Sequence, residues 1–390
     1  MEYVKIGDIC TKVCSGGTPS SGNPSYYEGG SIPWLNTNEV NFCRIYSTEK
    51  KITQLGYENS AAKYIDENSV IVAMYGVTAG KSAIAKKRLT TNQACCNLSI
   101  DGKKADYEYV YYYLKLQSET LNKLANGGAQ QNLNSKIIKD FKIPLPPLAI
   151  QHRIASILSA YDSQIENNQK RIKLLEQMAE NLYKEWFVRF RFPDYENAEF
   201  EGGMPKGWVS LVGDNKKPKG WTYGELNQLG TFIRGKNITA TEMIEGQVPV
   251  ISAGLEPAGY HNQANVCGPC LTISSSGANA GYLKYNLTDI WAADCSYYNN
   301  PDNIWFVYSS LKYLQPVISN LQCGAAQPHV YPKDVNRLCV ILPPKSLITE
   351  YNRQSSLIFK SIHNLKNQIF LLTTQRDLLL PRLISGKLSI

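Results

Sequence analysis

The chain repeats itself at a fixed spacing of 197 positions, and this repeat restricts the fold to two similar parts in tandem. With that shift, residues 127–147 align with residues 324–344 without a gap, and seven of the 21 aligned positions are identical. Composition alone would give about one or two identities over such a length. The phrase Leu-Pro-Pro at 145–147 is among the identical positions, and a second kind of segment follows it in both copies.

Apolar residues recur at alternating steps of three and four after each Leu-Pro-Pro phrase. This is the heptad spacing of a coiled coil, and Pro suits the first turn of a helix because its missing N–H has no partner there. We therefore predict long helices over residues 147–190 and 343–390, the second ended or kinked at Leu380-Pro381. The predicted seam comprises Ile154, Leu158, Tyr161, Ile165, Asn168, Ile172, Leu175 and Leu182, then Tyr351, Ile358, Ile362, Leu365, Ile369, Leu372 and Leu379.

The shared register favours pairing of the two helices with each other. The alternative is that each is an ordinary amphipathic helix lying on its own domain. Asn168 interrupts the apolar seam. A polar seam residue can set the register of a coiled coil, although a single Asn can also simply face solvent.

The segments upstream of the helices have another character. Residues 1–146 and 221–342 contain short apolar runs, such as Val70–Ala73, separated by Gly, Asn, Ser and Pro. Short strands with turns are typical of such a pattern. We predict an α+β fold with two globular domains, two long helices and a linker over residues 191–220. Since the helices are alike and the domains differ, the helices are expected to be a constant scaffold that presents two different recognition modules.

Composition and charge exclude several classes of protein. The hydrophobic fraction of 43% allows a sizeable core, and the longest uninterrupted apolar stretch is far shorter than the roughly 20 residues of a membrane span. The N-terminus has no signal-peptide core, and ten cysteines without a disulfide framework indicate reduced thiols. The chain is expected to be cytoplasmic and without membrane association. Its net charge of +8 is compatible with a polyanionic partner.

Several short motifs imitate catalytic or metal sites. Gly76–Ser82 has three residues between its glycines, where a phosphate-binding loop needs four. Cys267 and Cys270 have no second ligand pair for zinc, so buried thiols are expected, and Cys95-Cys96 should lie in a strand. Asn23–Tyr26 resembles a methyltransferase motif but lacks a Gly-rich cofactor turn, which favours a loop. We predict no catalytic residues, no metal and no cofactor bound by this chain.

The order of domains and helices, together with residues 143–154 (Ile-Pro-Leu-Pro-Pro-Leu-Ala-Ile-Gln-His-Arg-Ile), resembles the specificity subunits of type I restriction–modification systems. Further similarities are Ser15–Pro19, Gly127–Asn132 and Leu380–Leu388. The resemblance covers the whole chain. It departs in the second half, where Leu347–Tyr351 replaces the Gln-x-Arg phrase and Gln327–His329 replaces the Gln-x-Asn phrase.

The resemblance implies a non-catalytic subunit. Each globular domain would be a target-recognition domain that reads one half of a split, asymmetric double-stranded DNA target. The two helices would pack as an antiparallel coiled coil that sets a non-specific spacer. Two methyltransferase subunits would bind S-adenosylmethionine and methylate adenine at N6, and restriction/translocase subunits would complete the complex.

The polar, Gly-rich loops are the candidates for DNA contact, because amide side chains can read base edges and Lys or Arg can bind phosphate. The same loops could simply be turns. The candidates in the first domain are Gly17, Thr18, Ser20, Asn36, Thr37, Asn38, Tyr75, Thr78, Lys81, Gln130, Gln131 and Asn132. Those in the second are Arg234, Lys236, Asn237, Ser274, Ser275, Ser276, Asn279, Tyr282, Gln327 and His329.

Two other functions remain open from the sequence. One is a coiled-coil adaptor that organises protein partners without reading DNA. The other is a self-contained DNA methyltransferase or nuclease, against which the missing cofactor loop and acidic cluster argue.

Overall fold

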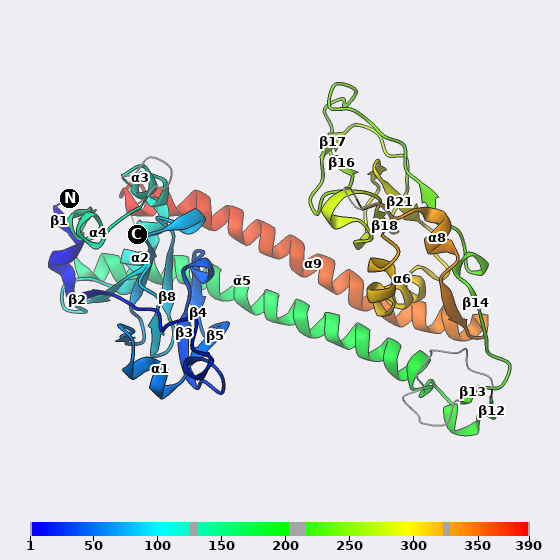
Figure 1. The fold of residues 1–390 in the computed structure, drawn as a ribbon. Coiled ribbons are helices and arrows are strands. Elements are labelled where there is room, and N and C mark those ends of the chain that lie inside the picture. The colour runs from blue at the N-terminus through cyan, green and yellow to red at the C-terminus, as the bar shows by residue number, and fades with distance from the viewer. Residues whose placement is uncertain (1, 125–131, 203–215, 323–327, 389–390) are drawn as a thin grey trace. The chain divides into compact units, whose positions relative to one another are not determined.

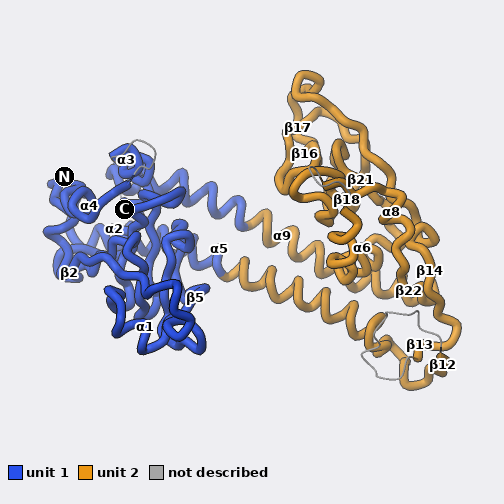
Figure 2. The backbone as a smooth tube through the Cα atoms, in the orientation of Figure 1, with its two compact units in different colours: residues 1–166, 369–390 blue, residues 167–368 orange. Residues whose placement is uncertain are grey.

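The computed structural model describes residues 2–124, 132–202, 216–322 and 328–388, and it divides into two compact units (Figure 2). The first unit contains residues 1–166 and 369–390, and the second contains residues 167–368. Each unit therefore combines one α+β domain with one half of each long helix.

A five-stranded sheet in the order β2-β10-β7-β8-β4 lies at the centre of the first unit (Figure 1). Strand β7 is buried at all four residues, because the continuous apolar run Val-Ile-Val-Ala suits a strand that is covered on both faces. A four-stranded sheet has the order β5-β3-β9-β6, and β1 pairs with β11. The strands are β1 (Tyr3–Lys5), β2 (Cys10–Ser15), β3 (Ile32–Leu35), β4 (Cys43–Ile45), β5 (Lys50–Ile52), β6 (Tyr64–Ile65), β7 (Val70–Ala73), β8 (Ser82–Ala85), β9 (Leu89–Thr91), β10 (Cys95–Ile100) and β11 (Lys142–Pro144).

Helix α2 packs between this sheet and the long helix α5 (Leu148–Tyr183), within the largest apolar cluster of the unit. The helix begins where Asp106 accepts a hydrogen bond from the backbone N–H of Tyr109 at 2.9 Å, which satisfies one of the free donors of the first turn. The short helices are α1 (Gln54–Glu58), α2 (Tyr107–Leu116), α3 (Ser118–Lys123) and α4 (Ser135–Asp140).

The second unit repeats this arrangement with shorter sheets in the orders β15-β21-β18-β19 and β17-β16-β20, and with the pair β14 and β22. Its strands are β14 (Thr222–Glu225), β15 (Ile233–Arg234), β16 (Val248–Ile251), β17 (Gly259–His261), β18 (Cys270–Ser274), β19 (Leu283–Asn286), β20 (Trp291–Ala292), β21 (Cys295–Tyr298) and β22 (Cys339–Leu342). Its helices are α6 (Ile304–Tyr313), α7 (Gln315–Ser319), α8 (Pro332–Asn336) and the long helix α9 (Lys345–Ile384).

The shift of 197 extends further upstream in the structure than sequence identity does. Helices α2 and α6 begin and end at positions related by this shift, and so do the first residues of α3 and α7, of α4 and α8, and of α5 and α9. Upstream of α2 the spacing changes, because the loops between strands differ in length. The strands that the two domains have in common follow the same order, and the predicted α+β repeat is confirmed.

The long helices α5 and α9 run antiparallel within each unit. In the second unit Asn168 contacts Gln368, while Tyr183 further along α5 packs on Tyr351 earlier in α9. In the first unit Asp162 contacts Arg376, and Ile154 shares an apolar cluster with Leu383. The predicted pairing of the helices is therefore present in both units.

Burial along the helices departs from a strict heptad at four positions. Asp162, Tyr183, Phe359 and Leu380 are buried, whereas the neighbouring seam positions Tyr161, Leu182, Ile358 and Leu379 are only half-buried. An α-helix has 3.6 residues per turn, so a strict 3.5-residue repeat drifts around the helix surface unless the helices supercoil. The globular domains also cover these helices, which widens the buried stripe beyond a two-helix seam. Ile154, Leu158, Ile165, Asn168, Tyr351, Ile362 and Leu365 are buried, and Ile172, Leu175, Ile369 and Leu372 are half-buried.

The second helix does not end at Leu380-Pro381 but continues to Ile384. Leu380, Leu383 and Ile384 are buried in the apolar cluster of the first unit, and their packing holds the last turn despite the missing N–H of Pro381. The first helix changes at Lys184–Val188 to a wider π-helical turn that buries Trp186 and Phe187.

The described part of residues 191–220 contains regular structure. Strands β12 (Phe200–Gly202) and β13 (Lys216–Pro218) pair antiparallel, and a short 3₁₀ turn spans Tyr195–Asn197. Trp221 packs on Phe190 and Phe192. In the part of the chain that the structure describes, no helix is long and apolar enough to cross a membrane.

Candidate nucleic-acid interface

One loop has the same backbone conformation in both domains, and candidate residues surround it. Residues 74–81 connect β7 to β8, and residues 275–282 connect β18 to β19. Each loop contains a 3₁₀ turn, Gly76–Thr78 and Gly277–Asn279. Gly76 and Gly277 have φ of 74° and 73°, and Gly80 and Gly281 have φ of 83° and 84°, a region where glycine is favoured because it lacks a Cβ.

The backbone hydrogen bonds of the two loops also correspond. The Gly80 N–H donates to the Ala73 carbonyl at 2.9 Å, and the Gly281 N–H donates to the Ser274 carbonyl at 2.8 Å. This turn joins two antiparallel strands and precedes no helix, so Gly76–Ser82 lacks the helix N-terminus with which a phosphate-binding loop holds its ligand.

Side-chain hydrogen bonds in the first domain link this loop to three other polar segments. Thr78 donates to the Thr37 carbonyl at 3.0 Å, and Asn92 donates to Asn36 and Thr37 at 3.2 and 3.1 Å. Thr18 is hydrogen-bonded to Gln93. The segments 17–20, 36–38, 75–78 and 91–93 are therefore joined to one another, and their exposed side chains are called the first surface below.

The backbone of Gly17 anchors the first of these segments. Its N–H donates to the Thr91 carbonyl at 2.9 Å, and its own carbonyl accepts from the Trp34 indole at 2.9 Å. A Cβ at this position would lie 2.2 Å from the backbone carbon of Ala61, so only glycine fits. Gly17 is buried and positions the segment rather than facing solvent.

A corresponding network holds the second domain together. Asp294 forms an ion pair with Arg234 and accepts a hydrogen bond from Ser276. The Lys236 N–H donates to the Ala292 carbonyl at 2.9 Å, and Ser276 forms a β-bridge with His329. The segments 234–237, 275–282 and 328–331 thereby meet at one surface.

The structure separates the candidate residues by exposure. Thr18, Ser20, Asn38, Tyr75, Asn132, Arg234, Lys236, Asn237 and Tyr282 are exposed, and Asn36, Lys81, Asn279 and His329 are half-buried. Gly17, Thr37, Thr78, Ser274, Ser275 and Ser276 are buried, and in this structure they shape the loops from beneath. Gln130, Gln131 and Gln327 lie outside the described residues.

Lys81 lies at the β8 end of its loop. Its ammonium donates to Asn41 at 2.9 Å and lies 5.9 Å from the centre of the Phe42 ring. The side chain is thus directed toward the segment before β4, and at the loop tip Val77 is almost completely exposed.

The sequence interpretation missed four residues that hold or extend these surfaces. Asn92, Gln93 and Asp294 link the segments, and Tyr331 is exposed and stacks on His329 with ring centres 6.1 Å apart. The polar pair Thr90-Thr91 at the end of β9 and the pair Asn92-Gln93 that follows it could have drawn attention to this connection. Asp294 and Tyr331 carry no local signal, because their role depends on which segments the fold brings together.

The groups on these surfaces are suited to recognition. Amides, hydroxyls and exposed aromatic rings can donate, accept and stack, but among the described residues no three His, Cys, Asp or Glu side chains come together to hold a metal. Burial raises the pKa of the Cys96 thiol to about 11, which keeps this thiol protonated near neutral pH. Cys95 and Cys96 lie in β10, as predicted. Buried thiols were also expected at Cys267 and Cys270. This prediction is wrong for Cys267, which is exposed in a loop, whereas Cys270 is buried in β18.

Two copies of one loop, set among different polar side chains and carried on paired helices, define a tandem recognition scaffold. The chain belongs to the family of the type I restriction modification DNA specificity domain, which matches residues 1–177 and 218–379.

Named relatives and a solved structure agree with this family. The chain is 29% identical to the type I restriction enzyme MjaIX specificity subunit of Methanocaldococcus jannaschii, with 100% of this chain and 94% of the relative covered. It is 25% identical to a putative type I specificity subunit of Mycoplasma genitalium over 84% of each chain. The crystal structure of a type I restriction-modification S subunit from M. genitalium has the same fold, with a TM-score of 0.67, 21% identity and coverage of 98% of this chain and 95% of that one.

Proposed function

We propose that this protein is the DNA sequence-specificity subunit of a type I restriction–modification complex. The observation that carries the proposal is the loop conserved between the domains, residues 74–81 and 275–282, whose backbone is the same and whose side chains differ. A shared backbone with different side chains is what two modules need in order to read two different half-sites by the same geometry. Each domain therefore recognises one half of a bipartite, asymmetric target.

The exposed polar residues of the two surfaces are the ones proposed to touch DNA. In the first domain these are Thr18, Ser20, Asn38, Tyr75 and Asn132, with Gln93 added from the structure. In the second domain they are Lys236, Asn237 and Tyr282, together with the half-buried His329 and the exposed Tyr331. Arg234 would exchange its ion-pair partner Asp294 for a phosphate. Amides specify bases, while Lys and Arg fix the position on the backbone.

The chain itself performs no chemistry in this proposal. Two methyltransferase subunits carry S-adenosylmethionine and methylate adenine at N6, and restriction/translocase subunits cut DNA whose target is unmethylated. The whole complex acts in the cytoplasm. Support comes from the family and from relatives named as specificity subunits of type I restriction enzymes. An adaptor without DNA recognition and a self-contained enzyme have no such support.

Sequencing of N6-methyladenine in host DNA tests the proposal. The gene is compared intact, deleted, and with Asn38 and Tyr75 both replaced by Ala. Methylation of one split, asymmetric motif should disappear on deletion, and the double variant should reduce methylation at that motif. Methylation that is unchanged by deletion, in cells that express the methyltransferase, would contradict the proposal.

A further inference from the structure

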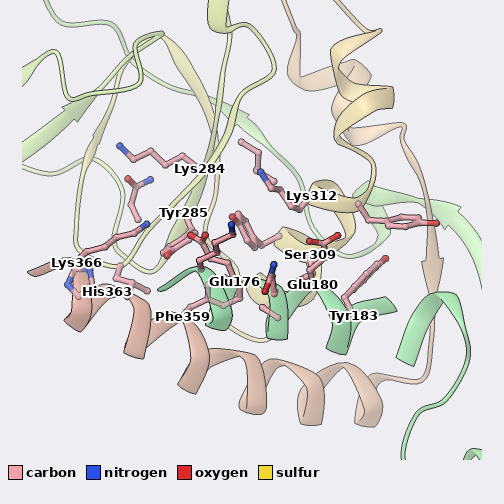
Figure 3. A pocket seen from close by; sticks show the side chains of 18 of the residues that line it. Glu176, Glu180, Tyr183, Lys284, Tyr285, Ser309, Lys312, Phe359, His363 and Lys366 are labelled. Carbon is pink, nitrogen blue, oxygen red and sulfur yellow. The ribbon is translucent and has the colours of Figure 1, made fainter. Parts of the chain in front are cut away.

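A cleft of about 670 Å³ lies beside β19 in the second unit (Figure 3). Side chains of β19 line it together with α5, α6 and α9, among them Tyr285, Lys312, Phe359 and Lys366. These four residues lie outside the surface proposed for DNA, whereas Tyr282, which also lines the cleft, belongs to that surface.

The first unit has a strand at the corresponding place. The strand that corresponds to β19 is β8, because both follow the shared loop and pair antiparallel with equivalent strands. In the first unit β4 pairs in parallel with β8, with Arg44 opposite Ile84. The Phe42 N–H donates to the Ser82 carbonyl at 2.9 Å, and the Lys86 N–H donates to the Ile45 carbonyl at 2.9 Å.

In the described part of the second domain no strand corresponds to β4, because one connection is shorter. Residues 36–49 join β3 to β5 and include β4, whereas only residues 252–258 join β16 to β17. Strand β19 is consequently the edge of its sheet. The Ser274 N–H donates to the Tyr282 carbonyl, so by the alternation of an antiparallel ladder the N–H and C=O of Leu283 and Tyr285 point to the open side.

The Tyr285 side chain adds an unused hydrogen-bonding group to this edge. Its ring packs on Trp305 and Phe359, with centres 5.6 and 5.1 Å away. Its hydroxyl is buried and makes no hydrogen bond within the described part of the chain. A buried hydroxyl without a partner is costly, and an incoming polar group would relieve that cost.

The side chains that surround this strand position are acidic in the first unit and mainly basic in the second. Arg44 of β4 lies 3.3 Å from the Glu108 carboxylate and 3.5 Å from that of Glu166. The shift of 197 places Trp305 and His363 at these two positions in the second unit. Five lysines line the cleft, against two glutamates, Glu176 and Glu180. The side chain that takes the place of Arg44 would therefore meet a positive environment.

We propose that this cleft binds an extended segment of a protein partner, which adds to the edge of β19 as β4 adds to β8 and which places an acidic side chain where β4 has Arg44. Addition of a strand to an open sheet edge is a general mode of peptide recognition, in which the backbone supplies affinity and side-chain pockets supply specificity. The partner is the methyltransferase subunit, an assignment that rests on the function proposed above; the strand-binding edge does not depend on it.

A synthetic peptide tests the chemistry of the cleft with the full-length chain. The peptide copies residues 41–47 with Cys43→Ser and Arg44→Glu, and the control peptide retains Arg44. By fluorescence anisotropy at low salt, the acidic peptide should bind about tenfold more tightly than the control peptide. Equal affinity of the two peptides, or no binding of either, would overturn the proposal.

Charge-reversed variants locate the binding. Lys312→Glu with Lys366→Glu should weaken binding of the acidic peptide about tenfold, because both exposed lysines line the cleft. Arg337→Glu with Lys345→Glu changes the net charge equally at exposed positions outside the cleft and should leave binding unchanged. Equal losses in both pairs would show a diffuse charge effect and would contradict the site.

A photo-cross-linking residue at position 284 identifies the occupant in the assembled complex. Cross-links to the methyltransferase subunit are expected. Cross-links to a second copy of this chain, or to DNA, would overturn the assignment of the partner. If deletion of the gene left host methylation unchanged while the acidic peptide still bound at β19, the proposed function would fail and the strand-binding cleft would stand.

Discussion

Arg376 on α9 forms an ion pair with Asp162 on α5, and both side chains are about nine-tenths buried. Tyr112 on α2 also donates to Asp162, at 2.6 Å. The shift of 197 places Phe359 at the position of Asp162 and relates Arg376 to Ala179. Phe359 and Ala179 lie in the same apolar cluster of the second unit. The repeat thus makes the same helix contact once with a buried ion pair and once with an apolar pair.

Arg376→Ala should lower the free energy of unfolding of the first unit by about 3 kcal/mol, because it leaves the buried Asp162 carboxylate without its cation. Asp162→Phe with Arg376→Ala and Tyr112→Phe copies the apolar contact and should return stability to within about 1 kcal/mol of the parent. Urea unfolding measures both, with hydrogen exchange of α6 as the internal control. A triple variant less stable than Arg376→Ala would refute the equivalence of the two contacts.

The shared loop should tolerate substitution differently at its two glycines. A Cβ added at Gly76 would meet no other atom within 4 Å. Gly76→Ala should therefore lower the free energy of unfolding by only about 1 kcal/mol, which is the cost of placing Ala in the left-handed backbone region. A Cβ at Gly80 would lie 2.7 Å from the Ser118 carbonyl oxygen, so Gly80→Ala should cost about 3 kcal/mol or more. Thermal unfolding compares the two variants, and equal costs would contradict the loop geometry.

Thiol reactivity should follow burial. At pH 8 burial keeps Cys270 and Cys295 protonated, since it raises the pKa of each to about 12, and a protonated thiol is a poor nucleophile. The exposed Cys267 should therefore be alkylated well before either in the native protein. Peptide mass spectrometry after iodoacetamide treatment measures the order, and urea should abolish it. Native Cys270 that reacts as fast as Cys267 would be inconsistent with its place in β18.

Exchange of residues 1–146 for the corresponding domain of another specificity subunit should change one half of the DNA target and leave the other half unaltered. The reason is that each domain has its own surface and its own apolar core. Methylation sequencing of the hybrid shows which half changes. A change in both halves would mean that the domains do not read independently.

Insertion of seven residues into both α5 and α9, near Asn168 and Gln368, should lengthen the spacer of the target. Seven helical residues add about 10 Å, which corresponds to about three base pairs. The insertion keeps the heptad register, so pairing of the helices should persist. Methylation at a motif with an unchanged spacer would show that the helices do not set the spacing; insertion of four residues, which breaks the register, is the control.

The proline-flanked repeat was enough to predict two α+β domains and two long paired helices. Its alignment needed no gap, and the periodicity of Ile154, Leu158 and Ile165 is a local property that any helix with this sequence shows. The helix boundaries were less predictable, because the turn beyond Pro381 is held by burial of Leu383 and Ile384 against residues far away in the sequence.

The positions of the candidate loops could be predicted from the sequence, but the exposure of their side chains could not. Gly, Asn and Ser are common in turns, so residues 75–81 and 275–279 could be recognised as loops. Exposure decided which of their side chains face outward: Ser274, Ser275 and Ser276 are buried, while Tyr282 is exposed. The composition of a loop does not contain this distinction, because it depends on what packs beneath.

The sequence by itself determined the tandem arrangement and the two long helices, favoured their pairing, and contained no recognisable catalytic motif, since these follow from spacing and residue type. Only the tertiary structure decided that Asp294 joins Arg234 to Ser276, that Asp162 faces Arg376, and that β19 keeps an open edge where β8 has β4. The physical reason is that such contacts join residues far apart in the chain. Their geometry is set by how the strands and helices pack.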